Sequence, residues 1–184
     1  MAQNIPVNIR PHLVSFLFKE LEGKEASYMN TKSKTIKIQR FSSLGKILYS
    51  QINDSILNIK RKDHFIIFLR IEKKSSFDYQ GHICIEVNKL FENLKLPEIN
   101  IININNLLED IFRISFIYYI EGSLDYNKDV PITTVIDKFI DKYDLLEVGY
   151  SNETLRRLYY REKNNQKKIA RLQNQSSNRV INYR

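Results

Sequence analysis

Basic and aromatic side chains gather near the C-terminal end of the chain, in a pattern that suits contact with a polyanion. The stretch VGYSNETLRRLYYREK (residues 148–163) combines a glycine turn, a helix cap and a run of arginines and tyrosines. Arginine can bind phosphate or pair bidentately with guanine, and tyrosine can bond to phosphate or stack. The side chains that we expect to contact nucleic acid are Arg156, Arg157, Tyr160, Arg161, Lys163, Lys167, Lys168 and Arg171.

The net charge of +8 is distributed unevenly along the 184 residues. Residues 1–74 contain 14 basic and 6 acidic residues, residues 75–155 contain 6 and 14, and residues 156–184 contain 9 and 1. The first two segments cancel, so the whole excess of positive charge lies in the last one. This concentration favours a polyanionic partner such as DNA. The acidic segment 75–155 provides an alternative, because it could bind another copy of the chain or a partner protein.

Two helices are expected to carry the basic stretch. Apolar residues recur at a spacing of three and four from Ile132 to Tyr143, which predicts an acidic amphipathic helix in PITTVIDKFIDKYDLLEV. Gly149 is expected at the following turn, and Ser151 as the cap of a second helix. The apolar faces that should pack together are Leu155, Leu158 and Tyr159 of the second helix and Phe139, Ile140, Tyr143 and Leu146 of the first.

The segment from Asp137 to Lys163, DKFIDKYDLLEVGYSNETLRRLYYREK, resembles the helix-turn-helix class found in small regulators and accessory proteins of phages and mobile elements. The resemblance covers about a seventh of the chain. It implies that the exposed face of the second helix enters the major groove of DNA. Leu145 lies four residues before the turn glycine, where this class usually has a small residue, so the two helices should be held farther apart or cross at a different angle.

Hydrophobic periodicity in the rest of the chain predicts strands and helices in mixed order. Strands are expected at residues 35–41, 64–71 and 82–87, and a last strand or extended connector at residues 99–104. Helices are expected at residues 11–23, 42–52, 88–96 and 105–122, the last of them apolar on nearly all sides. A polar loop should follow at residues 122–130.

The fold class that these elements predict is α+β. We expect a small antiparallel or mixed sheet with packed helices, followed by a C-terminal helical pair, a candidate helix-turn-helix, and a basic tail. The corresponding domains are an α+β body at residues 1–122, the helical pair at 131–168 and a disordered basic tail at 169–184.

Motifs for catalysis, metal binding or cofactor binding are not found in the sequence. The histidines His12, His64 and His82 are scattered, and none has a metal-ligand spacing from Cys84. The five glycines form no phosphate-binding loop. The carboxylate pairs Glu109–Asp110 and Asp137/Asp141 are interpreted as structural or solvated. We therefore expect no metal, no cofactor and no enzymatic activity.

The N-terminus has no signal-peptide pattern, and the most apolar run is too short to span a bilayer. With a single cysteine, these features predict a cytoplasmic protein without a membrane partner. The function predicted first is a non-enzymatic nucleic-acid-binding accessory or regulatory protein of a phage or mobile element. The alternative is a phage structural or assembly protein, such as a collar, connector, ring or packaging component, whose segregated charges mediate oligomerisation. That alternative would place the protein in the virion rather than the host cytoplasm.

Overall fold

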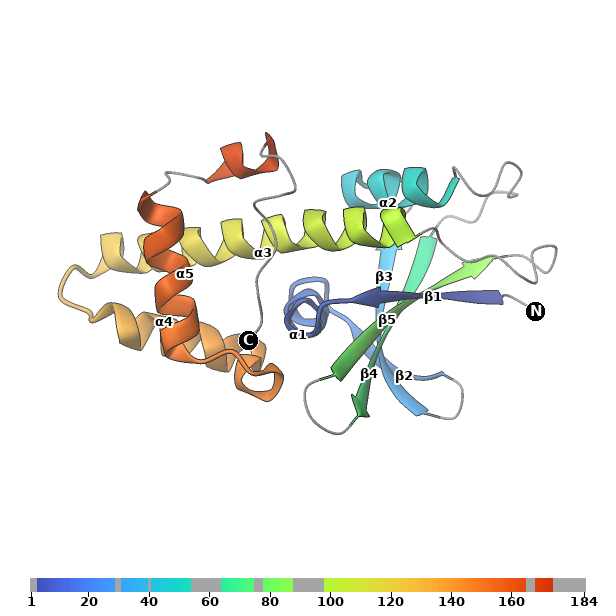
Figure 1. Cartoon of the computed structure of the whole chain (residues 1–184), viewed down its shortest axis with the longest axis horizontal. Coiled ribbons are helices and arrows are strands. Elements are labelled where there is room, and N and C mark those ends of the chain that lie inside the picture. The colour runs from blue at the N-terminus through green and yellow to red at the C-terminus, as the bar shows by residue number, and fades with distance from the viewer. Residues whose placement is uncertain are drawn as a thin grey trace. The chain divides into compact units, whose positions relative to one another are not determined.

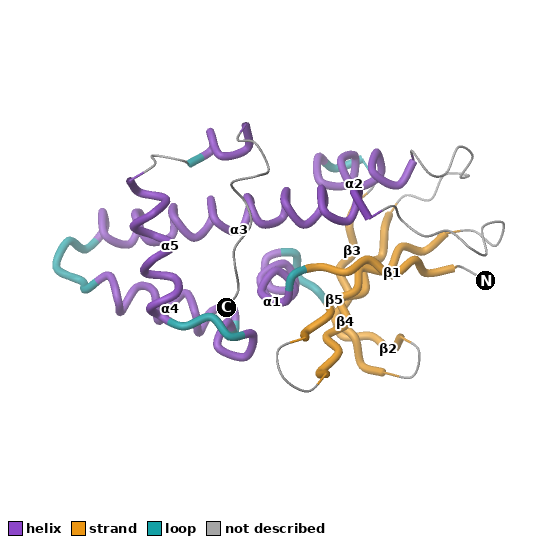
Figure 2. The backbone as a smooth tube through the Cα atoms, viewed as in Figure 1, coloured by secondary structure: helices purple, strands orange, loops and turns teal. Residues whose placement is uncertain are grey.

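The structure is a computed structural model that describes residues 3–28, 31–39, 41–53, 64–74, 78–87, 98–164 and 168–173. The chain divides into two compact units, Met1–Asn105 and Asn106–Arg184. Helix α3 (Glu98–Tyr126) contains the division between residues 105 and 106. Figures 1 and 2 show the elements of both units along the chain.

The first unit contains antiparallel strands and two helices that pack on them. The elements are β1 (Gln3–Ile9), α1 (Pro11–Glu20), β2 (Lys24–Tyr28), β3 (Thr31–Gln39), α2 (Ser43–Asn53), β4 (His64–Lys74) and β5 (Asp78–Val87). The backbones pair in the order β1-β5-β4-β3-β2, with Ile36 opposite Ile67 and Arg70 opposite His82. Helix α1 contacts β3, β4 and β5, and α2 contacts β3. Strands β4 and β5, which include the strands predicted at residues 64–71 and 82–87, pair antiparallel with each other.

Helix α1 begins where the sequence predicts, with Pro11 at its first position. The helix ends at Glu20, three residues before the predicted end at residue 23, and Glu22 adopts the left-handed conformation, with φ of 50°. The Gly23 amide donates to the Phe18 carbonyl at 2.7 Å, and the Glu22 amide donates to the Lys19 carbonyl at 3.5 Å. These two bonds form a Schellman motif that satisfies carbonyls at the helix end.

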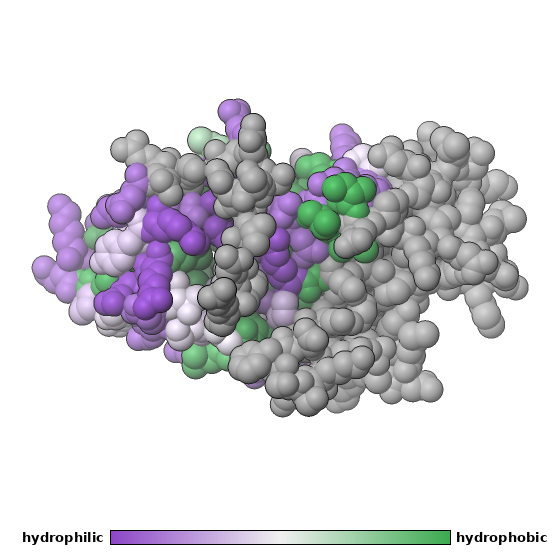
Figure 3. Space-filling model, in the orientation of Figure 1, coloured by the Kyte–Doolittle hydropathy of each residue, from purple (hydrophilic) through white to green (hydrophobic). Residues whose placement is uncertain are grey.

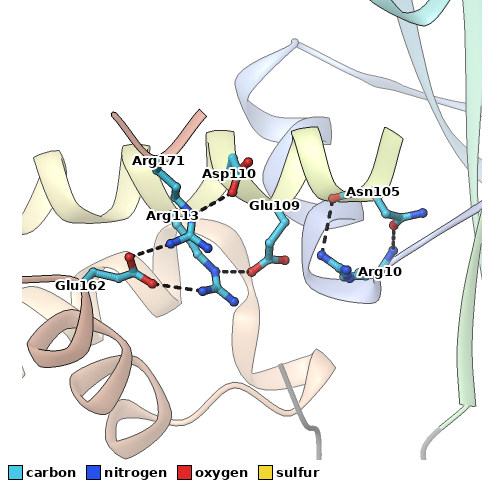
Figure 4. A network of polar contacts seen from close by, with 7 residues as sticks. All are labelled: Arg10, Asn105, Glu109, Asp110, Arg113, Glu162 and Arg171. Atoms are coloured by element: carbon cyan, nitrogen blue, oxygen red, sulfur yellow. Dashed lines mark hydrogen bonds and ion pairs between the residues drawn. The ribbon is translucent and has the colours of Figure 1, made fainter. Parts of the chain in front are cut away.

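Asparagines at the start of α3 hold the helices of the first unit. The Arg10 amide, which precedes α1, donates to Oδ1 of Asn105 at 2.9 Å (Figure 4). Nδ2 of Asn105 donates to the Ile101 carbonyl at 2.9 Å, so one amide side chain joins the two helices. Asn100 Nδ2 donates to the Gln51 carbonyl and holds the end of α2 in the same way.

The second unit is built from helices. It contains the remainder of α3, α4 (Ile132–Tyr143), η1 (Leu145–Val148), α5 (Asn152–Asn164) and η2 (Ile169–Gln173), where η denotes a 3₁₀ helix. Phe139 of α4 lies at the centre of its aromatic core. The Phe139 ring centroid is 5.0 Å from that of Phe116, 5.2 Å from Tyr119 and 4.7 Å from Tyr143. The contacts with Phe116 and Tyr119 are edge to face, and such contacts add to the apolar burial of the rings.

The predicted fold class, α+β with helices packed around a small sheet, is wrong. The structure describes the side chains of only part of the chain. Of these residues, 78% are helical, and the strand residues among them do not make up a sheet by themselves. Helices therefore predominate among these residues, and the backbone pairing of β1 to β5 is confined to residues 3–87.

Residues 99–104 account for part of this error. They are predicted as a strand or connector because isoleucine favours strands, but they form the first turns of α3. Burial overrides this weak intrinsic preference, since a stripe with a spacing of four is buried along α3. Its members are Ile104, Leu108, Phe112, Phe116 and Ile120. Helix α3 also continues to Tyr126, into the predicted loop, and the helix predicted at residues 88–96 lies outside the described residues.

Replacing Phe139 by alanine is expected to lower the free energy of unfolding by about 3–5 kcal/mol, because a buried ring is removed from among aromatic neighbours. Leu146→Ala is the matched control, since Leu146 is 65% exposed and its truncation should change stability by less than about 0.5 kcal/mol. Urea unfolding followed by circular dichroism measures both. Similar destabilisation in the two variants would contradict the central position of Phe139.

Candidate nucleic-acid interface

Gly149 and Ser151 build the turn that precedes α5, as the sequence predicts. Gly149 has φ of 83°, a left-handed conformation that side chains other than hydrogen rarely tolerate. The Tyr150 amide donates to the Leu145 carbonyl at 3.0 Å, which closes η1. Oγ of Ser151 then accepts the Thr154 amide at 3.2 Å and caps α5.

Helix α5 is attached to α4 by its first residue. Nδ2 of Asn152 donates to the Thr133 carbonyl at 2.9 Å and to Oδ1 of Asp137 at 2.7 Å. The apolar face of α5 is buried as predicted, at Leu155, Leu158 and Tyr159. These contacts fix which side of α5 faces inward and leave its basic side chains exposed.

The connection between α4 and α5 differs from that of a helix-turn-helix. Asp144 ends α4 in a left-handed conformation, and η1 follows, so eight residues separate the two helices. The helix-turn-helix motif uses a turn of about three or four residues. Leu145 is buried, whereas Leu146, which the sequence predicts to pack between the helices, is exposed. Because Asp144 is left-handed, the residues after it are rotated by one position relative to a continuous helix. Leu145 therefore takes the buried position that was predicted for Leu146.

Exposed cations of α5 surround a single acidic residue. Oε2 of Glu153 is 2.8 Å from Nη2 of Arg156, and Oε1 is 2.8 Å from Nε of Arg157. The hydrogen bond from Arg157, with the charges of both arginines, holds the pKa of Glu153 below its usual value. Tyr160, Arg161 and Lys163 are exposed further along the helix, and Arg161 makes no ion pair within the described part of the chain.

Two lysines of the predicted site lie over tyrosine rings. Nζ of Lys163 is 5.7 Å from the centroid of Tyr159, and Nζ of Lys168 is 5.6 Å from that of Tyr118. Lys168 also pairs with Glu121 at 2.7 Å, and this hydrogen bond raises the pKa of the lysine. Both lysines are exposed, so their charges can still be reached from solvent. Lys167 lies outside the described residues.

Arg171 is the exception among the predicted site residues, because it is buried, with 4% of its surface exposed. Its Nε donates to Oδ1 of Asp110 at 2.8 Å, and its Nη1 donates to Oε2 of Glu162 at 2.6 Å. A guanidinium enclosed by two carboxylates is not presented to an external phosphate. We therefore leave Arg171 out of the contact surface and assign it to the buried network of Figure 4.

The buried network continues from Glu162 to α3. The other oxygen of Glu162 accepts Nη1 of Arg113 at 3.1 Å, and Nε of Arg113 donates to Glu109 at 2.6 Å (Figure 4). Burial lowers the pKa of Arg113, but attraction to Glu109 and then to Glu162 outweighs this effect and raises the pKa overall. Nη2 of Arg113 is buried without a hydrogen-bond partner within the described residues. Glu162 thus joins α3, α5 and η2.

The buried network is not among the sequence predictions, although two signals point to it. Glu109, Asp110 and Arg113 interrupt an otherwise apolar helix, and charges in a buried helix need partners. Glu162 is the sole acidic residue among residues 156–184. The sequence does not reveal that these two features meet, since 49 residues separate Arg113 from Glu162.

The outward face of α4 and η1 carries acidic side chains close in sequence to the basic helix. Asp137, Asp141 and Glu147 are all exposed. The repulsion between a carboxylate and a phosphate about 4 Å apart is about 1 kcal/mol in water, and salt reduces this energy further. The acidic face therefore disfavours, by a modest amount, any nucleic acid that approaches α4 as well as α5.

No protein-family model, curated protein or solved structure matches the chain. Within the described residues, no group of three or more histidine, cysteine or acidic side chains is arranged to hold a metal ion. None of the described helices has the length and apolar character needed to cross a bilayer.

Replacing Glu162 by alanine is expected to lower the free energy of unfolding by about 3–5 kcal/mol, because two buried guanidiniums are left without the carboxylate between them. The matched control is Glu153→Ala, which removes an exposed carboxylate that also lies between two arginines; little or no change is expected there. Thermal unfolding of both variants measures the difference. A Glu162 variant as stable as the Glu153 variant would show that the network is not stabilising.

Proposed function

We propose that the chain is a non-enzymatic nucleic-acid-binding accessory or regulatory protein that contacts the nucleic-acid backbone through α5. The contact surface consists of the exposed side chains Arg156, Arg157, Tyr160, Arg161, Lys163 and Lys168, with Lys167 as its expected continuation. Its origin in a phage or mobile element and its place in the cytoplasm remain predictions from the sequence.

The separation of apolar and basic residues around α5 carries this proposal. Leu155, Leu158 and Tyr159 are buried, so packing fixes the rotation of the helix about its axis. The basic residues then face solvent together, and the surface over α5 is largely hydrophilic in Figure 3. Clustered lysine and arginine side chains bind phosphates by releasing counterions, which needs no preformed pocket.

The eight-residue connection and Glu153 bear on how α5 meets its partner. A recognition helix contacts bases with its N-terminal residues. In α5 that end carries Glu153, whose carboxylate partly neutralises Arg156 and Arg157. The proposal therefore rests on backbone contact and not on base reading by a helix-turn-helix.

Assembly of copies through opposite charges is a second candidate, favoured by the exposed acidic residues Asp137, Asp141 and Glu147. The basic α5 of one copy could contact this face on the next. Such head-to-tail contacts generate rings or filaments. This is the arrangement expected of the structural or assembly protein named as the alternative.

The double variant Arg161→Ala/Lys163→Ala is expected to weaken binding to a mixed-sequence DNA duplex. The slope of log K against log salt should decrease in magnitude by about 0.9 for each phosphate that the variant no longer neutralises. Fluorescence anisotropy at several salt concentrations measures it. Lys128→Ala/Lys138→Ala is the matched control, because it removes the same charge from exposed positions outside α5. No binding by the unmodified protein at low salt would exclude the proposed function.

Reversing charge at Asp141 and Glu147 to lysine distinguishes the two candidates. If nucleic acid is the partner, binding should tighten because two repulsive charges become attractive. If copies of the chain associate, oligomers of the unmodified protein should dissociate in the variant. Sedimentation velocity over a range of concentrations, run beside anisotropy, reports both. A monomer at every concentration would exclude the assembly candidate.

A further inference from the structure

We propose that α5 binds single-stranded nucleic acid in preference to duplex, with the Tyr160 ring as a stacking platform for one base. This inference rests on the proposed function and specifies the class of nucleic acid that the surface takes. It follows from the order of side chains along one exposed stripe of α5 and from the charges at the helix start.

Arg156, Tyr160 and Lys163 form this stripe, at positions i, i+4 and i+7 of α5. Residues at this spacing lie on the same side of a helix, about one turn, or roughly 5.4 Å, apart. The aromatic ring is therefore flanked by a cation on each side. All three side chains are exposed, and Tyr160 is 48% exposed.

The Tyr160 ring is held by its neighbour. The buried ring of Tyr159 contacts it edge to face, with 5.5 Å between centroids and 69° between planes. Because Tyr159 itself is fixed in the core, this contact restricts the orientations of Tyr160. A ring that is oriented before binding loses little entropy when a base stacks on it.

The arrangement suits a single strand better than a duplex. Bases of a duplex are stacked on one another and present only their edges in the grooves, whereas an unpaired base can stack on an aromatic ring. The flanking cations can then bind the phosphates of the same strand. Duplex binding would instead bring a second backbone near the helix, whose start carries the exposed carboxylate of Glu153.

Fluorescence anisotropy tests this inference with three labelled nucleic acids: a DNA strand of mixed sequence and about 20 nucleotides, the matching RNA strand and the DNA duplex. A strand of this length exceeds the usual site size of about 4–16 nucleotides. We expect tighter binding of at least one single strand than of the duplex. Tyr160→Ala should weaken single-strand binding by on the order of tenfold, since stacking of one base on an aromatic ring contributes that much, and should change duplex binding by less than about twofold. Tyr160→Phe, which keeps the ring, should bind the single strand nearly as tightly as the unmodified protein.

Three results would overturn the inference while leaving the proposed function intact. The first is tighter binding of the duplex than of both single strands. The second is that Tyr160→Ala weakens the binding of single strand and duplex equally. The third is that Tyr160→Ala weakens the binding of neither. Tyr126→Ala is the matched control, because Tyr126 is an exposed tyrosine of α3 that lies outside the stripe. No binding of any of the three nucleic acids by the unmodified protein would overturn both proposals together.

Discussion

The buried carboxylate of Glu162 is the constraint on which the helical unit depends. Charges inside a protein are costly unless paired, and each oxygen of Glu162 accepts a different guanidinium, from Arg113 of α3 and Arg171 of η2. Helix α3 must therefore meet α5 and η2 at one point, although Arg113 and Glu162 are 49 residues apart. Because Glu162 lies on the same side of α5 as Leu158 and Tyr159, this pairing also fixes which residues of the helix face outward.

Charge counted along the sequence overstates the cationic surface of the C-terminal segment. Arg171 is enclosed by carboxylates, Arg156 and Arg157 share Glu153, and Lys168 pairs with Glu121. The least compensated cations of the described segment are in the second half of α5. Any polyanion should therefore be drawn to that half, where Tyr160 lies, and not to the helix start.

Local signals predict the start of α5 well, while features set by tertiary contacts do not follow from the sequence. Gly149 and Ser151 act through their own backbone and side chain, so their positions follow from residue type. The isoleucines of residues 99–104 favour a strand, but burial along α3 imposes a helix. The burial predicted for Leu146 is wrong because the left-handed Asp144 changes the helical phase, and no neighbouring residue signals it.

The segment η2 is held in a manner opposite to that of an ordinary amphipathic helix. Its charged residue Arg171 faces inward, whereas Ile169 and Leu172 are exposed. Detachment of this segment would uncover charged groups and little additional apolar surface. Urea sensitivity scales with the surface exposed in an opening, so local release of η2 would depend only weakly on denaturant. Hydrogen exchange in this segment would then be governed by electrostatics, while the aromatic core around Phe139 would open only in global unfolding.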